Sequence, residues 1–150
     1  MKQPRIYVDT SVIGGCLDLA FETESQLLID MARQGAVSLL ISDLVAEELL
    51  QAPPAVREIL ATLPDECIER VFITPETESL RDSYLAREVV GPRSASDAHH
   101  VAIATVCRAD MIVSWNFRHL VHYEKIRHFN SVNLHEGYGT IEIYSPKEVV

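Results

Sequence analysis

The chain has 150 residues with a formal net charge of −9, and 47% of them are hydrophobic. A chain of this length folds as one domain with a buried core, without disulfide or metal staples. The composition is globular and excludes a disordered, collagen-like or coiled-coil protein. Every apolar run is far shorter than the ~18 residues of a membrane span, so we expect no membrane segment.

The cysteines Cys16, Cys67 and Cys107 lack the C-x-x-C spacing of a redox or zinc motif. The first residues lead directly into a strand-like segment, so we also expect no signal peptide. These features together predict a protein of the reducing cytoplasm, where free cysteines persist.

Negative charge is concentrated in the first 80 residues, which hold 5 basic and 14 acidic side chains, whereas residues 81–150 hold 8 of each. All six histidines lie between His99 and His135. A phosphate backbone responds to local potential and to bound cations rather than to total charge. The charge therefore does not exclude a nucleic-acid ligand, but it predicts weak, salt-sensitive binding unless a metal or a partner helps.

Short apolar segments alternate along the chain with segments of helical periodicity. In chain order we expect a strand at 5–8, a helix at 25–33, a strand at 37–41, helices at 43–50 and 55–63, a strand at 70–73, helices at 75–89 and 94–108, and strands at 111–115 and 141–144. Strands that alternate with helices require crossover connections, which predict a mostly parallel sheet with helices on both faces. The fold class is therefore α/β, in one domain.

Several of these boundaries carry recognisable end signals. Ser42-Asp43 and Thr74-Pro75 are typical helix starts, because their side chains cap the first turn or, for proline, fit its backbone. Pro53-Pro54 and Gly91-Pro92 interrupt the helices that precede them.

In a parallel sheet of this kind, the functional site lies beyond the carboxyl ends of the strands. Asp9 directly follows the first expected strand, and Ser11 comes two residues later. Their other interpretation is structural, with Asp9 as a helix N-cap and Ser11 as a cap or turn hydroxyl. Position makes Asp9 a candidate catalytic acid and leaves both roles open.

Glu47 and Glu48 point in different directions from one expected helix. At about 100° per residue, Glu48 falls inside the apolar arc of that helix, whereas Glu47 falls outside it. A carboxylate on a core-facing arc is costly unless it is paired or binds a cation. Glu48 is therefore a candidate site residue, with a side chain that reaches water from the edge of the arc as the alternative.

Asp97 begins a helix that is apolar nearly all round and is therefore expected to be buried. The alternative for Asp97 is structural, because Ser94-x-x-Asp97 matches the spacing of a capping box. His100 lies about one turn later and near the same face, as a supporting partner of the acid or as a hydrogen-bonded core histidine.

Asn116 follows the apolar strand expected at 111–115, where an amide is either a site residue or a turn residue. His119 and His122 have the spacing of a metal pair, but no third ligand is evident, so we do not expect zinc. Acids and an amide on four separate elements thus coincide at the strand ends. Hard oxygen ligands favour Mg²⁺ or Mn²⁺, and such an ion suits hydrolysis of a phosphodiester.

Four short motifs occur in the order and with the spacing found in a known family. They are Tyr7-Val8-Asp9-Thr10-Ser11, Glu48-Leu49 before Ala52-Pro53, Asp97-Ala98-x-His100-Val101-Ala102 and Ser114-Trp115-Asn116-Phe117-x-His119. On these residues the chain resembles the PIN domain over essentially its whole length. Within that family it is most similar to the VapC-like bacterial proteins with a Trp-Asn-Phe motif, many of which are toxins of toxin–antitoxin pairs.

The resemblance implies a three-layer α/β/α fold over residues 1–150 and Mg²⁺- or Mn²⁺-dependent cleavage of RNA. It implies that Asp9, Glu48 and Asp97 are the catalytic and metal-binding acids, and that Ser11 supports the first acid or contacts phosphate. Asn116 stands where many members have a fourth acid, which removes a negative charge from the place of a second metal.

The same resemblance implies three partners: an RNA substrate, a cognate antitoxin protein of a type II pair, and a second copy of the chain in a homodimer. Arg118, His119 and Lys125 are candidates for contacts with the RNA backbone.

Two other functions fit parts of this pattern. A haloacid-dehalogenase-type phosphatase also has an acid after its first strand, but it needs a second Asp where this chain has Ser11. A PIN-like domain that has lost catalysis and serves as an RNA-binding or assembly module fits Asn116. Retention of Asp9, Glu48 and Asp97 favours the nuclease, because unpaired inward carboxylates are costly.

Overall fold

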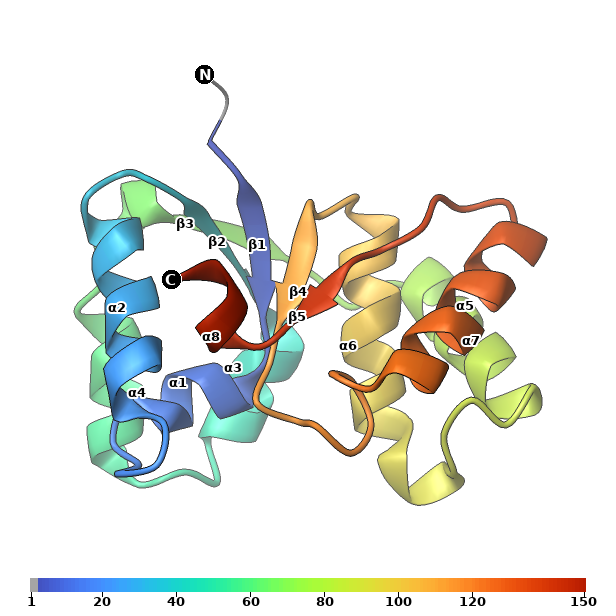
Figure 1. The fold of residues 1–150 in the computed structure, drawn as a ribbon, viewed down its shortest axis with the longest axis horizontal. Coiled ribbons are helices and arrows are strands. Elements are labelled where there is room, and N and C mark those ends of the chain that lie inside the picture. Colours follow the sequence, from blue (N-terminus) through green and yellow to red (C-terminus); the bar gives the residue numbers. More distant parts are fainter. Residues whose placement is uncertain (1–2) are drawn as a thin grey trace.

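Five parallel strands form the central sheet of the structure, a computed structural model that describes residues 3–150 (Figure 1). The sheet has the strand order β3-β2-β1-β4-β5, so β1 lies at its centre, and every neighbouring pair is parallel. The strands are β1 (Arg5–Val8), β2 (Ser38–Ser42), β3 (Ile68–Val71), β4 (Met111–Val113) and β5 (Ile143–Tyr144). The predicted parallel α/β sheet is confirmed.

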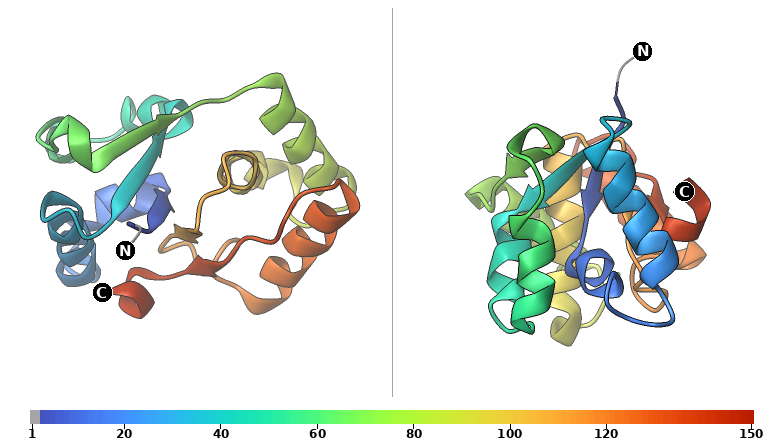
Figure 2. Two further views of the ribbon diagram at one scale, coloured as in Figure 1. Left: turned by 90° about the horizontal axis from the view of Figure 1, so that it is seen from above. Right: turned by 90° about the vertical axis from the view of Figure 1, so that its left-hand side faces the viewer.

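Helices cover both faces of this sheet, and the views of Figure 2 show them as two groups on opposite sides. Short 3₁₀ turns precede β3 and α6. The helices are α1 (Thr10–Gly15), α2 (Glu22–Arg33), α3 (Asp43–Leu49), α4 (Pro54–Ala61), α5 (Pro75–Ala86), α6 (Ala95–Val106), α7 (Tyr123–His135) and α8 (Pro146–Val149).

The alternation of side chains along the strands builds a separate core on each face. Tyr7 packs with α5, α6 and α7, whereas its neighbours Ile6 and Val8 pack with α1, α2 and α4. Leu40 and its neighbours in β2 divide in the same way. The result is the expected three-layer α/β/α arrangement.

Two expected helix starts are formed by the predicted caps. Ser42 Oγ accepts a hydrogen bond from the backbone nitrogen of Val45 at the start of α3. Thr74 and Thr77 form a reciprocal capping box at the start of α5. The pattern of hydrogen-bonding side chains thus predicted where these helices begin.

Helix α7 and the position of β3 differ from the prediction. Tyr123–His135 was not expected to be helical, because it buries only Phe129, Val132 and Asn133 and its exposed positions are mostly polar or charged. Strand β3 lies at Ile68–Val71 instead of 70–73, because the chain leaves the sheet after Val71, and the Ile73 nitrogen donates to Asp43.

None of the helices within residues 3–150 is both long and apolar enough to span a membrane. The carboxyl ends of β1, β2 and β4 are neighbours in the sheet, and Asp9, Ser42 and Ser114 lie at these ends. This edge of the sheet carries the candidate site.

Candidate active site

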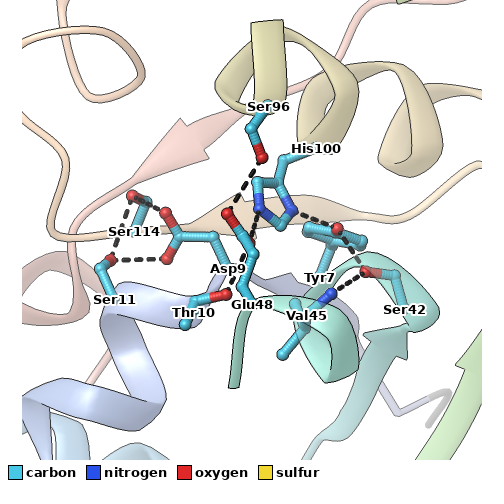
Figure 3. Close-up of polar contacts among 10 residues, drawn as sticks. All are labelled: Tyr7, Asp9, Thr10, Ser11, Ser42, Val45, Glu48, Ser96, His100 and Ser114. Carbon is cyan, nitrogen blue, oxygen red and sulfur yellow. Dashed lines mark hydrogen bonds and ion pairs between the residues drawn. The ribbon is translucent and has the colours of Figure 1, made fainter. Parts of the chain in front are cut away.

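Asp9 lies at the junction of β1 and α1 and is only 4% exposed. It occupies the N-cap position of α1, but its side chain makes no capping hydrogen bond, so the structural alternative for this carboxylate is wrong. Instead, Ser11 Oγ donates to Asp9 Oδ1 and Ser114 Oγ donates to Asp9 Oδ2, each over 2.6 Å (Figure 3). Two hydroxyls therefore hold the two carboxylate oxygens.

Backbone groups orient these two hydroxyls. The Trp115 nitrogen donates to Ser11 Oγ, and the Asn116 nitrogen donates to Ser114 Oγ, both over 2.9 Å. Since each hydroxyl already accepts an N–H group, its own proton is directed to Asp9. Residues that follow the neighbouring strands β1 and β4 thus fix the Asp9 carboxylate.

The pKa of Asp9 depends on its burial and on the groups around it. Burial raises the pKa of Asp9, and the charge of Asp97 acts in the same direction, whereas the hydroxyls of Ser11 and Ser114 act to lower it. The net pKa lies above the ordinary value. The ionised form of Asp9 is therefore an energetic cost to the fold that a cation would relieve.

Glu48 points toward the same edge from α3, whereas Glu47 is exposed, as the helical arc predicts. Its Oε1 accepts hydrogen bonds from Thr10 over 2.7 Å and from His100 over 2.6 Å, and its Oε2 accepts one from Ser96 over 3.0 Å (Figure 3). Burial alone would raise the pKa of Glu48, but these donors outweigh it and lower the pKa to about 2. Glu48 is therefore an ionised, fully oriented carboxylate.

Asp97 lies in the first turn of α6 and is half-buried. Ser94 at the N-cap makes no side-chain capping bond, so the expected capping-box alternative is not formed. Burial raises the pKa of Asp97 and the charge of Glu48 adds to this, while His119 and the Asn116 amide act to lower it. Because Asp97 affects the pKa of Asp9 and is itself affected by Glu48, the three predicted acids share one electrostatic environment.

The remaining predicted site residues differ in how deeply they are buried and in what they contact. Asn116 accepts a hydrogen bond from the His119 nitrogen through Oδ1, which is the turn role considered for it, and its amide lies near Asp97. Among residues 3–150, the buried His119 Nδ1 has no hydrogen-bond partner. Arg118 is exposed, and Lys125 Nζ donates to the Val89 carbonyl.

Sequence reasoning missed several side chains that support the acids. Their common feature is a hydroxyl group at a strand end or on a neighbouring helix; they are Tyr7, Thr10, Ser42, Ser96 and Ser114. A polar group in an otherwise apolar, buried strand needs a partner, and this signal was available for Tyr7 and Ser114.

The donor chemistry fits a hard divalent ion, but within residues 3–150 no group of three His, Cys, Asp or Glu side chains is arranged to enclose one. Each oxygen of Asp9 accepts one hydroxyl and keeps a free lone pair, and so does Oε2 of Glu48. Mg²⁺ commonly binds to one or two carboxylates and retains several waters. An ion at this site would therefore complete its coordination with water.

Comparison with solved structures identifies the fold. The crystal structure of VapBC2 from Rickettsia felis bound to a DNA fragment from their promoter contains a chain with a TM-score of 0.60 and 12% identity, over 94% of this chain and 98% of that chain. The structure of DNA-bound VapBC from Salmonella typhimurium contains one with a TM-score of 0.55 and 17% identity, over 96% and 99%. Neither a protein-family model nor a curated protein matches the sequence. The PIN-like fold implied by the four motifs is confirmed.

Proposed function

We propose that the chain is a Mg²⁺- or Mn²⁺-dependent endoribonuclease that hydrolyses RNA phosphodiester bonds as the toxin of a type II toxin–antitoxin pair. The observation that carries this proposal is that Glu48 accepts hydrogen bonds from Thr10 and Ser96, the residues beside Asp9 and Asp97, so that three separate elements meet at the acids. A fold without this chemistry has no reason to keep the buried Asp9 carboxylate, whose charge is a cost to the fold.

Each acid has a distinct part in the proposed reaction. Asp9, fixed by Ser11 and Ser114, presents one free lone pair on each oxygen, and Glu48 presents one on Oε2. Asp97 is more exposed than Asp9 and adds negative charge near it. When bound, the ion supplies an activated water and stabilises charge that develops on the phosphoryl group.

The same site and fold also suggest which RNA contacts and protein partners to propose. We propose that exposed Arg118 and half-buried His119 contact the RNA backbone beside Asp97. Lys125 is a further candidate. The shared fold with chains of two VapBC complexes supports a cognate antitoxin partner, and the homodimer and cytoplasmic location are proposed with it.

A non-catalytic RNA-binding or assembly module is the second candidate. Asn116 in place of an acid favours it, as does the lack of a ready-made three-ligand cage within the described residues. Metal-dependent thermal stability separates the two: Mn²⁺ raises the melting temperature of a nuclease with this site, whereas a module without a metal site shows no shift.

The direct test is cleavage of an end-labelled structured RNA with Mg²⁺ or Mn²⁺, with and without EDTA. We expect cleavage by the wild type, none with EDTA, and at least a hundredfold loss in Glu48→Gln, because loss of a residue that merely supports a metal ligand already costs about 10–100-fold. Glu47→Gln is the matched control, because Glu47 is the exposed neighbour on the same helix. Cleavage that survives EDTA and Glu48→Gln would exclude the metal mechanism.

A further inference from the structure

Behind Glu48, a row of polar side chains crosses the core from α6 to the start of α3 (Figure 3). His100 Nε2 lies 2.6 Å from Glu48 Oε1, and His100 Nδ1 lies 2.5 Å from the Tyr7 hydroxyl. The Tyr7 hydroxyl lies 2.9 Å from Ser42 Oγ, which accepts the backbone N–H of Val45 over 3.1 Å. The row thus ends at a peptide N–H, which can only donate.

The inner members of the row are shielded from water. Tyr7 is 0%, Ser42 1% and His100 2% exposed. Burial also raises the pKa of Tyr7 well above its ordinary value, so the phenol keeps its proton. Each proton in the row must therefore find an acceptor among these side chains.

The donor and the acceptor of each hydrogen bond in the row can be assigned by starting from the Val45 backbone N–H. Ser42 Oγ already accepts the Val45 N–H, and among residues 3–150 the Tyr7 oxygen is the acceptor available to its proton. Tyr7 in turn donates to His100 Nδ1. The ring proton of His100 is then on Nε2, where it is donated to Glu48.

The other arrangements each leave a buried group without its partner. With the ring proton on Nδ1, the lone pair of His100 Nε2 would face a Glu48 carboxylate oxygen at 2.6 Å. With protons on both ring nitrogens, Tyr7 would donate to Ser42, and the Ser42 proton would have no acceptor within the described residues. Either arrangement leaves a polar atom of the buried His100 or Ser42 without its hydrogen bond.

We infer that Tyr7 and Ser42 are positioning residues that hold His100 as the neutral Nε2–H tautomer and thereby fix the orientation of Glu48. Thr10 and His100 then occupy Glu48 Oε1, so that Oε2 is the oxygen that remains available to a ligand. The tautomer follows from the core alone, whereas its effect on metal binding rests on the proposed function.

Imidazole NMR of the full-length ¹⁵N-labelled chain tests the tautomer without any activity. Long-range ¹H–¹⁵N correlations, with His100 assigned from His100→Gln, are expected to show a proton on Nε2 and an unprotonated Nδ1 at neutral pH. A proton on Nδ1, or on both nitrogens, overturns the inference. The tautomer is read from the wild type, and His100→Gln serves only to assign the resonances.

Tyr7→Phe tests the positioning role, and Tyr84→Phe is its matched control. Both hydroxyls belong to fully buried tyrosines, but Tyr84 bonds to Asn133 in a different polar cluster. We expect Tyr7→Phe to shift the His100 Nδ1 resonance. We also expect it to weaken the apparent Mn²⁺ affinity, measured by thermal stabilisation, about 10-fold or more, as loss of a residue that supports a metal ligand does. Tyr84→Phe should leave both unchanged.

The results separate this inference from the proposed function. If Tyr7→Phe shows the wild-type His100 resonances, or the same Mn²⁺ affinity as a wild type that binds Mn²⁺, Tyr7 has no positioning role. If the wild type neither binds Mn²⁺ nor cleaves RNA, the proposed function fails, while the NMR spectra still decide the tautomer.

Discussion

Ser114 donates a hydrogen bond over 2.6 Å to Asp9, a residue 105 positions earlier in the chain. The same hydroxyl accepts the Asn116 backbone N–H, so it links the central strand β1 to the loop after β4. One fully buried side chain thus joins the fold of the sheet to the geometry of the candidate site.

Removing this hydroxyl leaves two buried groups without partners. We expect Ser114→Ala to lower the free energy of unfolding by about 1–3 kcal/mol, because Asp9 loses a donor and the Asn116 N–H loses its acceptor. Chemical denaturation measures this. Ser131→Ala, at an exposed position of α7, should change stability by no more than about 0.5 kcal/mol. If both substitutions changed the free energy of unfolding equally, the buried Ser114 hydroxyl would not contribute more to stability than an exposed one.

Neutralising Asp9 should remove a pH-dependent penalty from the metal-free protein. Its raised pKa means that the charged form is disfavoured in the fold, so the penalty is present above that pKa and disappears as the pH falls through it. Asp9→Asn removes this penalty but offers one acceptor oxygen to two hydroxyls, so Ser11 or Ser114 loses its partner at every pH. Without metal, we therefore expect the melting temperature of Asp9→Asn relative to the wild type to be higher at pH 7 than at acid pH. A melting-temperature difference that does not change with pH would contradict this account.

The contribution of Glu48 to stability should have the opposite pH dependence. Its pKa of about 2 lies below the ordinary 4.5, so its contribution is complete above about 4.5 and is lost as the pH falls toward 2. At pH 7 we expect Glu48→Gln to lower the free energy of unfolding by roughly 1–2 kcal/mol, after allowance for solvent screening of a carboxylate that is one-third exposed.

Denaturation of Glu48→Gln and the wild type between pH 2 and pH 7 measures that dependence, with Glu47→Gln again as the control. The stability difference should shrink toward acid pH for Glu48→Gln and stay near zero for Glu47→Gln. A constant difference for Glu48→Gln would indicate lost packing rather than a charge stabilised by its donors.

Gly15 lets Trp115 pack against α1. A Cβ atom at this position would lie 2.6 Å from Ser25 Oγ and 2.8 Å from Trp115 Nε1, atoms that are hydrogen-bonded to each other. We expect Gly15→Ala to destabilise the protein by about 1–3 kcal/mol in chemical denaturation, as overpacking does. A Cβ at Gly14 in the same helix meets nothing within 4 Å, so Gly14→Ala should be neutral or stabilising. Similar results for the two glycines would rule out the close approach as the cause.

Local patterns were enough to predict the sheet, the capped helix starts and the inward direction of Glu48. These features depend on neighbouring residues, through the alternation of strands and the period of a helix. Helix α7 was missed because only Phe129, Val132 and Asn133 of its residues are buried, which leaves little apolar periodicity.

The supporting network of the site could not be predicted in the same way. The Tyr7 hydroxyl meets Ser42, 35 residues away, and His100, 93 residues away. No local pattern encodes such pairs, because each depends on how three elements pack. The sequence could show only that a tyrosine in a buried strand needs a partner.

The central place of β1 also affects when the site can form during synthesis. A chain made only as far as α5 carries Asp9 and Glu48 but lacks α6 and β4, which provide Asp97, His100 and Ser114. Under the proposed function, a nascent polypeptide still attached to its ribosome therefore has no complete catalytic centre. The site is assembled only after α6 and the residues that follow β4 have been synthesised and have docked onto β1.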